Sequence, residues 1–140
     1  MGVKLFTLEE AERTLPLVRR IVADLQEEYP AWREAVGYFE LVTNSLRADE
    51  GETGELQAAQ AAVAARAARI SEYLAELEAS GCMLKGFEAG QVDFYSLRDD
   101  RPVYLCWTLG EERITHWHDL DAGYAGRRPI DDAILSETAR

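Results

Sequence analysis

The chain has 140 residues, of which 47% are hydrophobic and 29% charged, a composition typical of a globular protein with one core. Its 26 acidic residues outnumber its 15 lysines and arginines, which gives a formal net charge of -11. No segment is basic, so we expect no nucleic-acid partner, because such proteins neutralise phosphates with clustered lysine and arginine. No apolar run approaches the roughly 18 residues that a membrane span needs.

The two cysteines and the start of the chain both favour a cytoplasmic location. The first six residues lead directly to Glu9 and Glu10, which leaves no room for the apolar stretch of a signal peptide. Cys82 and Cys106 are too few for a disulfide framework, so we expect both thiols to be reduced.

A first helix is predicted to begin near Leu8. Thr7 and Glu10 have the spacing of a capping box, in which each side chain bonds a backbone N–H at the start of the helix. Pro16 removes one N–H from this helix. Two outcomes are open: the helix kinks at Pro16, or Thr14 caps a second helix that has Pro16 in its first turn.

The clearest periodic signal is a stripe of residues spaced alternately by three and four, of which only one is polar. This stripe comprises Leu15, Val18, Val22, Leu25, Tyr29, Trp32, Val36, Phe39, Thr43 and Leu46. Such spacing keeps the side chains on one side of a helix, as in a coiled-coil seam. The pattern keeps its phase across Pro30, so a bend is expected there rather than a break. Aromatic residues at this spacing are typical of a core or an oligomer seam rather than of a cofactor pocket.

A second amphipathic helix is predicted after a polar loop at residues 47–54. Its apolar positions are Leu56, Ala59, Val63, Ala67, Ile70, Leu74 and Leu77. Gly81 is suited to the left-handed cap that ends a helix. Residues 8–80 therefore form an antiparallel helical hairpin. A hairpin this long cannot hide both of its faces on a small sheet, so we expect a homo-oligomer, most simply a dimer, through the helices.

After Gly81 the hydrophobic period changes from 3.6 to 2, which predicts strands at residues 82–85, 92–97, 103–109 and 113–118. Asp99-Asp100 and residues 110–112 are the predicted turns. From Asp119 a glycine-rich loop follows, and residues 131–140 form a tail that is frayed helix. The fold class is α+β: a single domain over 1–140, with the hairpin packed on a three- to four-stranded antiparallel β-meander and the C-terminal loop within 81–130.

The predicted turns set the register of the strands. Asp93 faces Cys106, Cys106 faces His116, and Tyr104 faces His118. One face of the sheet then carries Val92, Phe94, Val103, Leu105, Trp107, Leu109 and Trp117. The other face gathers Asp93, Tyr95, Tyr104, Cys106, His116 and His118. A slip of one residue in the last hairpin would move both histidines to the helix side.

The polar face contains candidate ligands for a divalent metal such as zinc. His116, His118, Asp93 and Cys106 offer imidazole, carboxylate and thiolate groups, which suit zinc or another transition ion. The spacing matches no specific zinc signature. Two alternatives stay open: a strand end with partly exposed polar side chains, and a Cys106 nucleophile with a histidine base.

The glycine-rich loop is a second candidate site. Gly123 and Gly126 permit unusual backbone angles, and Arg127 offers a bidentate donor for a carboxylate or phosphate. The alternative is that Arg127 or Arg128 pairs with Asp121, Asp119 or a helix carboxylate and pins the loop. The candidate ligand-binding residues for a small anion are His118, Asp121, Arg127 and Tyr104.

Several segments resemble the bacterial domain-of-unknown-function family 2203. These segments are Phe6 to Ala11, Leu15-Pro16, Val92-Asp93-Phe94, Val103 to Trp107, Gly110-Glu111, Trp117-His118 and Asp121 to Pro129. The resemblance covers the chain from end to end and implies a single-domain cytoplasmic protein. It carries no assigned activity, cofactor or catalytic residue. His116 stands where the family pattern accepts an aromatic residue, which favours His118 acting alone, beside Asp121 and Arg127.

Two functional hypotheses follow. The first is a non-catalytic binding, regulatory or assembly module that associates through its helices and holds a small anionic ligand or a protein partner at the loop of His118, Asp121 and Arg127. The polar residues cluster there without a nucleophile, base and orienting group. The alternative is a metal-dependent, hydrolase-like enzyme that uses His116 and His118 with Asp93 or Cys106.

Overall fold

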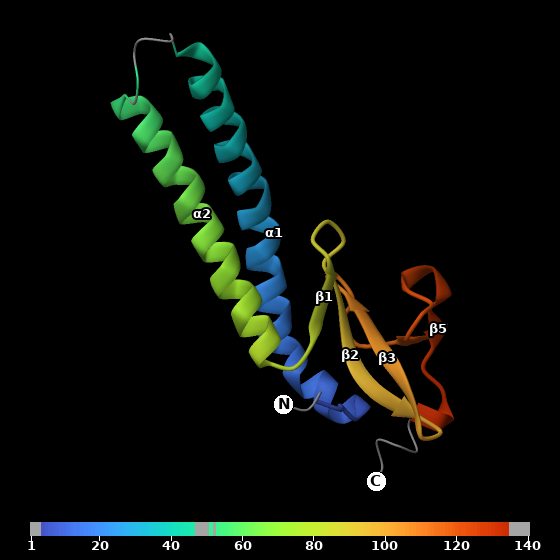
Figure 1. The fold of residues 1–140 in the computed structure, drawn as a ribbon. Helices are drawn as coiled ribbons and strands as arrows, with labels where there is room; N and C mark the ends of the chain where they lie inside the picture. The colour runs from blue at the N-terminus through green and yellow to red at the C-terminus, as the bar shows by residue number, and fades with distance from the viewer. Residues whose placement is uncertain (1–3, 47–50, 52, 135–140) are drawn as a thin grey trace.

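The computed structural model describes residues 4–46, 51 and 53–134 (Figure 1). Two long helices, α1 (Leu8–Ser45) and α2 (Gly54–Ala79), lie side by side, and a five-stranded sheet packs on one end of the pair. The strands are β1 (Met83–Gly86), β2 (Gln91–Arg98), β3 (Arg101–Thr108), β4 (His116–Asp119) and β5 (Arg128–Pro129). They follow one another in the sheet in chain order, and each pair is antiparallel. The α+β fold with an antiparallel meander is therefore confirmed.

Helix α1 begins where the capping residues predict. The Thr7 hydroxyl accepts the Glu10 N–H at 3.1 Å, and the Glu10 carboxylate accepts the Thr7 N–H at 2.9 Å. Both Pro16 and Pro30 lie inside the helix, so the alternative in which Thr14 caps a second helix is wrong. The Thr14 hydroxyl instead donates to the carbonyl of Glu10 at 2.8 Å, within one continuous helix.

Helix α2 runs back along α1 and starts two residues earlier than its first apolar residue, because Thr53 caps it by accepting the N–H of Leu56 at 3.1 Å. Most of the loop predicted at 47–54 lies outside the described residues. Between the helices, the half-exposed guanidinium groups of Arg66 and Arg69 reach the buried Glu28 carboxylate at 3.0 and 3.2 Å. These two ion pairs join the helices midway along the hairpin.

The register of the central strands is the one predicted. Asp93 pairs with Cys106, Cys106 with His116, and Tyr104 with His118. Asp99 and Asp100 have positive φ angles of 52° and 62°, as a two-residue hairpin turn requires. The two faces of the sheet therefore carry the apolar and polar sets that strand alternation assigns to them.

Two boundaries were wrong in the C-terminal part. Residues 113–115 are not strand, and β4 starts at His116. The connection between β3 and β4 is longer than the predicted turn at 110–112, because Glu111 bonds residues at the end of β3. Its carbonyl accepts the Trp107 indole N–H at 2.8 Å, and its carboxylate accepts the Thr108 N–H at 2.7 Å. The sheet has five strands rather than three or four, since the glycine-rich loop contains η1 (Tyr124–Gly126) and returns as β5 beside β4. Of the predicted tail, residues 132–134 are helical and 135–140 lie outside the described residues.

The core lies between the proximal half of the hairpin and the inner face of the sheet. Its largest fully buried side chains include Trp107, Trp117, Phe94, Ile21, Leu25, Leu77 and Leu105. Within the described residues, neither helix is apolar enough over a sufficient length to cross a membrane.

Candidate metal centre

Three chemically reactive side chains meet on the outer face of the sheet, the face turned away from the helices. Asp93, Cys106 and His118 come from β2, β3 and β4, and they are 0%, 0% and 2% exposed. One potential ligand atom of each lies within 4.8 Å of the others. Buried charged or polar groups are costly unless they are paired or bind a metal, so this cluster requires an explanation.

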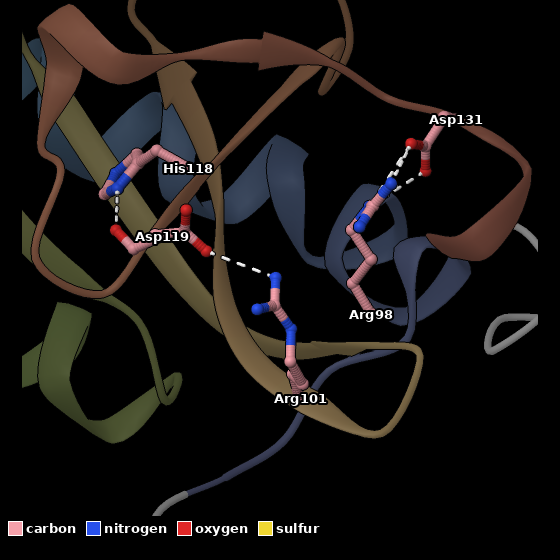
Figure 2. A network of polar contacts seen from close by, with 5 residues as sticks. All are labelled: Arg98, Arg101, His118, Asp119 and Asp131. Carbon is pink, nitrogen blue, oxygen red and sulfur yellow. Dashed lines mark hydrogen bonds and ion pairs between the residues drawn. The ribbon is translucent and has the colours of Figure 1, made fainter.

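The hydrogen bonds of His118 orient its ring for metal binding. Nδ1 lies 2.8 Å from the backbone carbonyl oxygen of Asp119, a contact that Figure 2 shows. A carbonyl only accepts, so Nδ1 carries a proton, and Nε2 is the ring nitrogen whose lone pair a metal can take in place of a proton. Nε2 lies 3.1 Å from Oδ2 of Asp93. Metal-binding histidines usually donate their other ring N–H to a carbonyl or carboxylate in this way.

Asp119, the last residue of β4, also contacts the first residue of β3. Its carboxylate lies 3.6 Å from the guanidinium of Arg101 (Figure 2). The same residue therefore uses its carbonyl to orient His118, while its carboxylate forms an exposed ion pair with Arg101. This arrangement fixes the histidine tautomer through backbone rather than through a second side chain.

Asp93 has unused ligand capacity. Its Oδ2 contacts His118, whereas Oδ1 is buried and has no N–H or O–H partner among the described residues; the Cys106 thiol is a weak donor beside this carboxylate. An unsatisfied buried carboxylate oxygen costs about 1–3 kcal/mol or more. A cation bound at the cluster would satisfy this oxygen, and Asp93 could then supply two donor atoms.

Cys106 is held as a neutral thiol in the metal-free protein. Burial, followed by the neighbouring Asp93 carboxylate, raises the pKa of its thiol to about 12, although Arg127 acts in the opposite direction. A thiol of this kind is a poor nucleophile at neutral pH. It becomes a thiolate when a metal ion replaces its proton, so the environment of Cys106 suits metal binding better than nucleophilic catalysis.

Arg127 and Glu111 border the cluster. The Arg127 guanidinium is 11% exposed and lies 2.9 and 3.1 Å from the two carboxylate oxygens of Glu111. This pair ties the glycine-rich loop to the turn between β3 and β4. The loop is thus pinned by an arginine–carboxylate pair, as one sequence-based alternative held, but the partner is Glu111 rather than Asp121, Asp119 or a helix carboxylate.

The size of the cluster fits a zinc-type ion after a small contraction. Zinc–ligand bonds of about 2.0–2.3 Å in tetrahedral geometry set neighbouring donor atoms about 3.3–3.8 Å apart. Nε2 of His118 and Oδ2 of Asp93 are already 3.1 Å apart, and no pair of donors exceeds 4.8 Å, so the wider pairs need to close by at most about 1–1.5 Å. Asp93, Cys106 and His118 would then supply one oxygen, one sulfur and one nitrogen as ligands, with the second Asp93 oxygen close to the ion.

The other residues singled out in the sequence lie around this cluster. Tyr104 packs its ring 5.4 Å from that of His118. His116 pairs with Cys106 across the strands but is not one of the three clustered groups, and its Nδ1 lies 2.8 Å from the Thr115 hydroxyl. Asp121 is exposed in the loop and forms no ion pair with another described residue. Of the proposed anion-binding residues, His118 thus contacts Asp93 and Tyr104, whereas Arg127 is paired with Glu111.

Sequence reasoning missed two participants. The predicted turn at 110–112 does not indicate that Glu111 bonds Thr108 and pairs with Arg127 sixteen positions later. The Asp119 carbonyl, which orients His118, is a backbone group that residue type cannot indicate. One available signal for this pair was charge: Glu111 is an acidic residue in a predicted turn, and Arg127 is a basic residue in the glycine-rich loop.

A comparison with protein-family models gives one finding. Residues 4–130 match the model described as uncharacterized conserved protein DUF2203. No curated protein and no solved structure gives a significant match. The matched region contains both helices, the whole sheet and the Asp93, Cys106 and His118 cluster, and the chain therefore belongs to the domain-of-unknown-function family 2203.

Proposed function

We propose that this chain is a non-catalytic module that binds one divalent transition-metal ion, of the zinc class, through Asp93, Cys106 and His118. The observation that carries the proposal is that their ligand atoms lie within 4.8 Å of one another although all three side chains are buried. Nitrogen, sulfur and oxygen donors in one cluster are those that zinc prefers.

Charge balance supports an ion at this position. The Asp93 carboxylate and the Cys106 thiolate together carry two negative charges, which a divalent cation neutralises, while His118 contributes a neutral nitrogen. The bound state then leaves no uncompensated buried charge and satisfies Oδ1 of Asp93. The formal net charge of -11 also raises the local concentration of cations around the protein.

Burial favours a structural or regulatory ion over a hydrolytic one. Catalytic zinc keeps a coordination position that water and substrate can reach, whereas the three ligands here are at most 2% exposed. An ion at this position would join β2, β3 and β4. Release of the ion would loosen the outer face of the sheet and the loop that the Arg127–Glu111 pair holds. The supply of metal could thereby regulate the conformation of this region.

The experiment is titration of the metal-free protein with Co²⁺, which replaces zinc and reports its ligands in the absorption spectrum. We expect one equivalent to bind with a sulfur-to-cobalt charge-transfer band. Cys106→Ser removes this band, and His118→Ala weakens binding. His116→Ala is the matched control, because His116 lies two residues away on the same strand but outside the cluster. This variant should leave the charge-transfer band and the affinity unchanged. Spectra without a thiolate band, or loss of binding only in His116→Ala, would overturn the proposal.

The titration also addresses the hydrolase alternative. Cobalt with an exchangeable water in its coordination sphere binds added azide or cyanide, which alters the spectrum. We expect no such change, because the site is closed. A clear response to these anions would favour the open coordination position of an enzyme.

A small anion is the second candidate ligand, and one observation favours it. Nε of Arg127 is buried and has no hydrogen-bond partner within residues 4–46, 51 and 53–134, so the guanidinium has a donor available at the loop. Inorganic phosphate is the probe: stabilisation against heat that Arg127→Lys abolishes and Arg128→Lys retains would support this site. Equal effects of phosphate on both variants would remove the candidate.

A further inference from the structure

The distal part of the hairpin, defined here as residues 31–46 of α1 and 54–69 of α2, has no sheet to pack on. Figure 1 shows that the two helices continue well past the end of the sheet. The core takes its α1 residues from Ala11 to Leu25, and beyond Glu28 only Val42 of α1 is buried. Ala59 is the single buried residue of the distal α2 segment.

The apolar stripe of α1 nevertheless continues into this part. Its proximal members Leu15, Val18 and Val22 are buried against the sheet. Trp32, Val36 and Phe39 continue the same stripe with the same spacing, but they are only half-buried. A helix side that is fully buried at one end and partly exposed at the other offers an apolar surface to a partner.

Two charged residues beside the distal stripe indicate which partner packs on it. Arg33 and Glu40 are both exposed, and neither forms an ion pair with another described residue. Seven residues separate them, which is close to two helical turns, so they lie on one side of α1. Their midpoint falls between Val36 and Gly37. A second α1 related by a two-fold axis at this midpoint would run antiparallel and bring Arg33 of each copy to Glu40 of the other.

The glycine at this midpoint permits close approach. A Cβ added at Gly37 would meet no atom within 4 Å, so the helix surface is open there. A partner helix can therefore cross α1 with its backbone close to Gly37. Self-complementary charges around an open crossing point favour a second copy of this chain over an unrelated protein.

A groove at the base of the stripe fits the same arrangement. It has a volume of about 510 Å³, lies where the β1–β2 turn meets α1, and is lined by Gln26, Tyr29, Pro30, Arg33, Phe87 and Glu88. Antiparallel pairing about Val36 and Gly37 places residues 40–44 of the second copy beside residues 29–33 of the first, three of which line the groove. Glu40 of the second copy then lies next to Arg33, and the end of its α1 helix fills the groove.

We propose that the chain forms a two-fold symmetric dimer in which the α1 stripes of two copies pack antiparallel across Val36 and Gly37. The proposal is independent of the metal site, which lies on the outer face of the sheet. It requires no change in the fold of either copy.

Charge reversal tests the pairing in the full chain, with sedimentation velocity over a range of concentrations as the measurement. We expect a dimer whose dissociation constant rises at least tenfold in Arg33→Glu and in Glu40→Arg, because each change creates two like-charge contacts. The double variant restores dimerisation. Arg20→Glu makes the same change in charge at an exposed position of α1 outside the stripe, and it has no effect. A wild-type chain that stays monomeric, or a double variant no better than the single ones, would refute the dimer.

Cross-linking tests the crossing point independently. Val36→Cys should form a disulfide-linked dimer on oxidation, since the two-fold axis brings position 36 of the copies together. Leu41→Cys is the control: Leu41 is 69% exposed, but it lies about 140° around the helix from Val36. Circular dichroism checks the helix content of both variants. Cross-linking of Leu41→Cys in preference to Val36→Cys would place the interface on the opposite side of the hairpin and contradict the proposal.

Discussion

Nε2 of His118 lies 3.1 Å from Oδ2 of Asp93, although β3 separates the strands that carry them. Cys106 of β3 pairs directly with Asp93 of β2 and with His116 of β4. His118 lies two residues beyond His116 on the same strand. The side chains of Asp93 and His118 therefore reach toward each other across the face of β3, over the thiol. Three adjacent strands contribute one ligand group each, which makes the cluster as rigid as the sheet itself.

Asp93→Asn should weaken metal binding by about 100-fold or more, because the amide keeps the shape of the side chain but removes its charge and one anionic donor. The metal-free protein should change in stability by no more than about 1–2 kcal/mol, since the amide N–H can still donate a hydrogen bond to Nε2 of His118. Chelator competition measures the affinity and urea denaturation the stability. Asp121→Asn, in the exposed loop, is the control with unchanged affinity. Retained affinity in Asp93→Asn would show that the ion binds elsewhere.

Metal affinity should increase with pH. Burial and Asp93 raise the pKa of the Cys106 thiol to about 12, so the thiol is protonated throughout the neutral range and must release its proton when the ion binds. One released proton tightens apparent binding about tenfold for each unit of pH. Competition titrations between pH 7 and 9 measure this slope, and Cys106→Ser should reduce it. An affinity independent of pH would mean that the thiolate is not a ligand.

Asp131→Asn should lower stability modestly, by less than about 1 kcal/mol, as expected for an ion pair with a partly exposed member. The Arg98 guanidinium donates to this carboxylate at 2.6 Å (Figure 2), and this hydrogen bond holds the pKa of Asp131 below its usual value. A lowered folded-state pKa stabilises the fold above the unfolded pKa of about 3.9, and the contribution is lost as pH falls through the folded value. The difference between wild type and variant should therefore be present at pH 7 and vanish in acid. Urea denaturation at both pH values checks this, and a difference that grows in acid would contradict it.

Gly90→Ala should destabilise the fold by about 2–4 kcal/mol. Gly90 has a φ of +67°, and an added Cβ would lie 2.9 Å from Cβ of Leu109 and 3.0 Å from Cγ1 of Val22. Backbone strain and overlap with the core thus act together. Gly86→Ala, at the other end of the same turn, meets nothing within 4 Å and serves as the control with little change. Thermal and urea denaturation compare the two, and equal stabilities would mean that the turn can shift away from the core.

Much of the site could be predicted because strand alternation is a short-range property. The turn at Asp99-Asp100 sets the register of β2 and β3, and this register alone places Asp93 opposite Cys106. The capping residues Thr7 and Glu10 similarly locate the start of α1. These signals act within a few residues, so they do not depend on the rest of the fold.

The remaining features depend on contacts between distant segments. Alternation places His116 and His118 on the same face, but it does not show that His118 is buried beside Asp93 whereas His116 bonds Thr115. The pairing of Arg127 with Glu111 joins two irregular segments, for which no periodic pattern exists. The two-residue strand β5 is too short for alternation to be detectable.

The most direct test of the metal-binding function is the metal content of the purified native protein, measured by mass spectrometry for the wild type, His118→Ala and His116→Ala. We expect close to one equivalent of a zinc-class ion in the wild type and in His116→Ala, and its loss in His118→Ala. Absence of any ion from all three proteins, or equal content in His118→Ala, would contradict the assignment of the Asp93, Cys106 and His118 cluster as a metal centre.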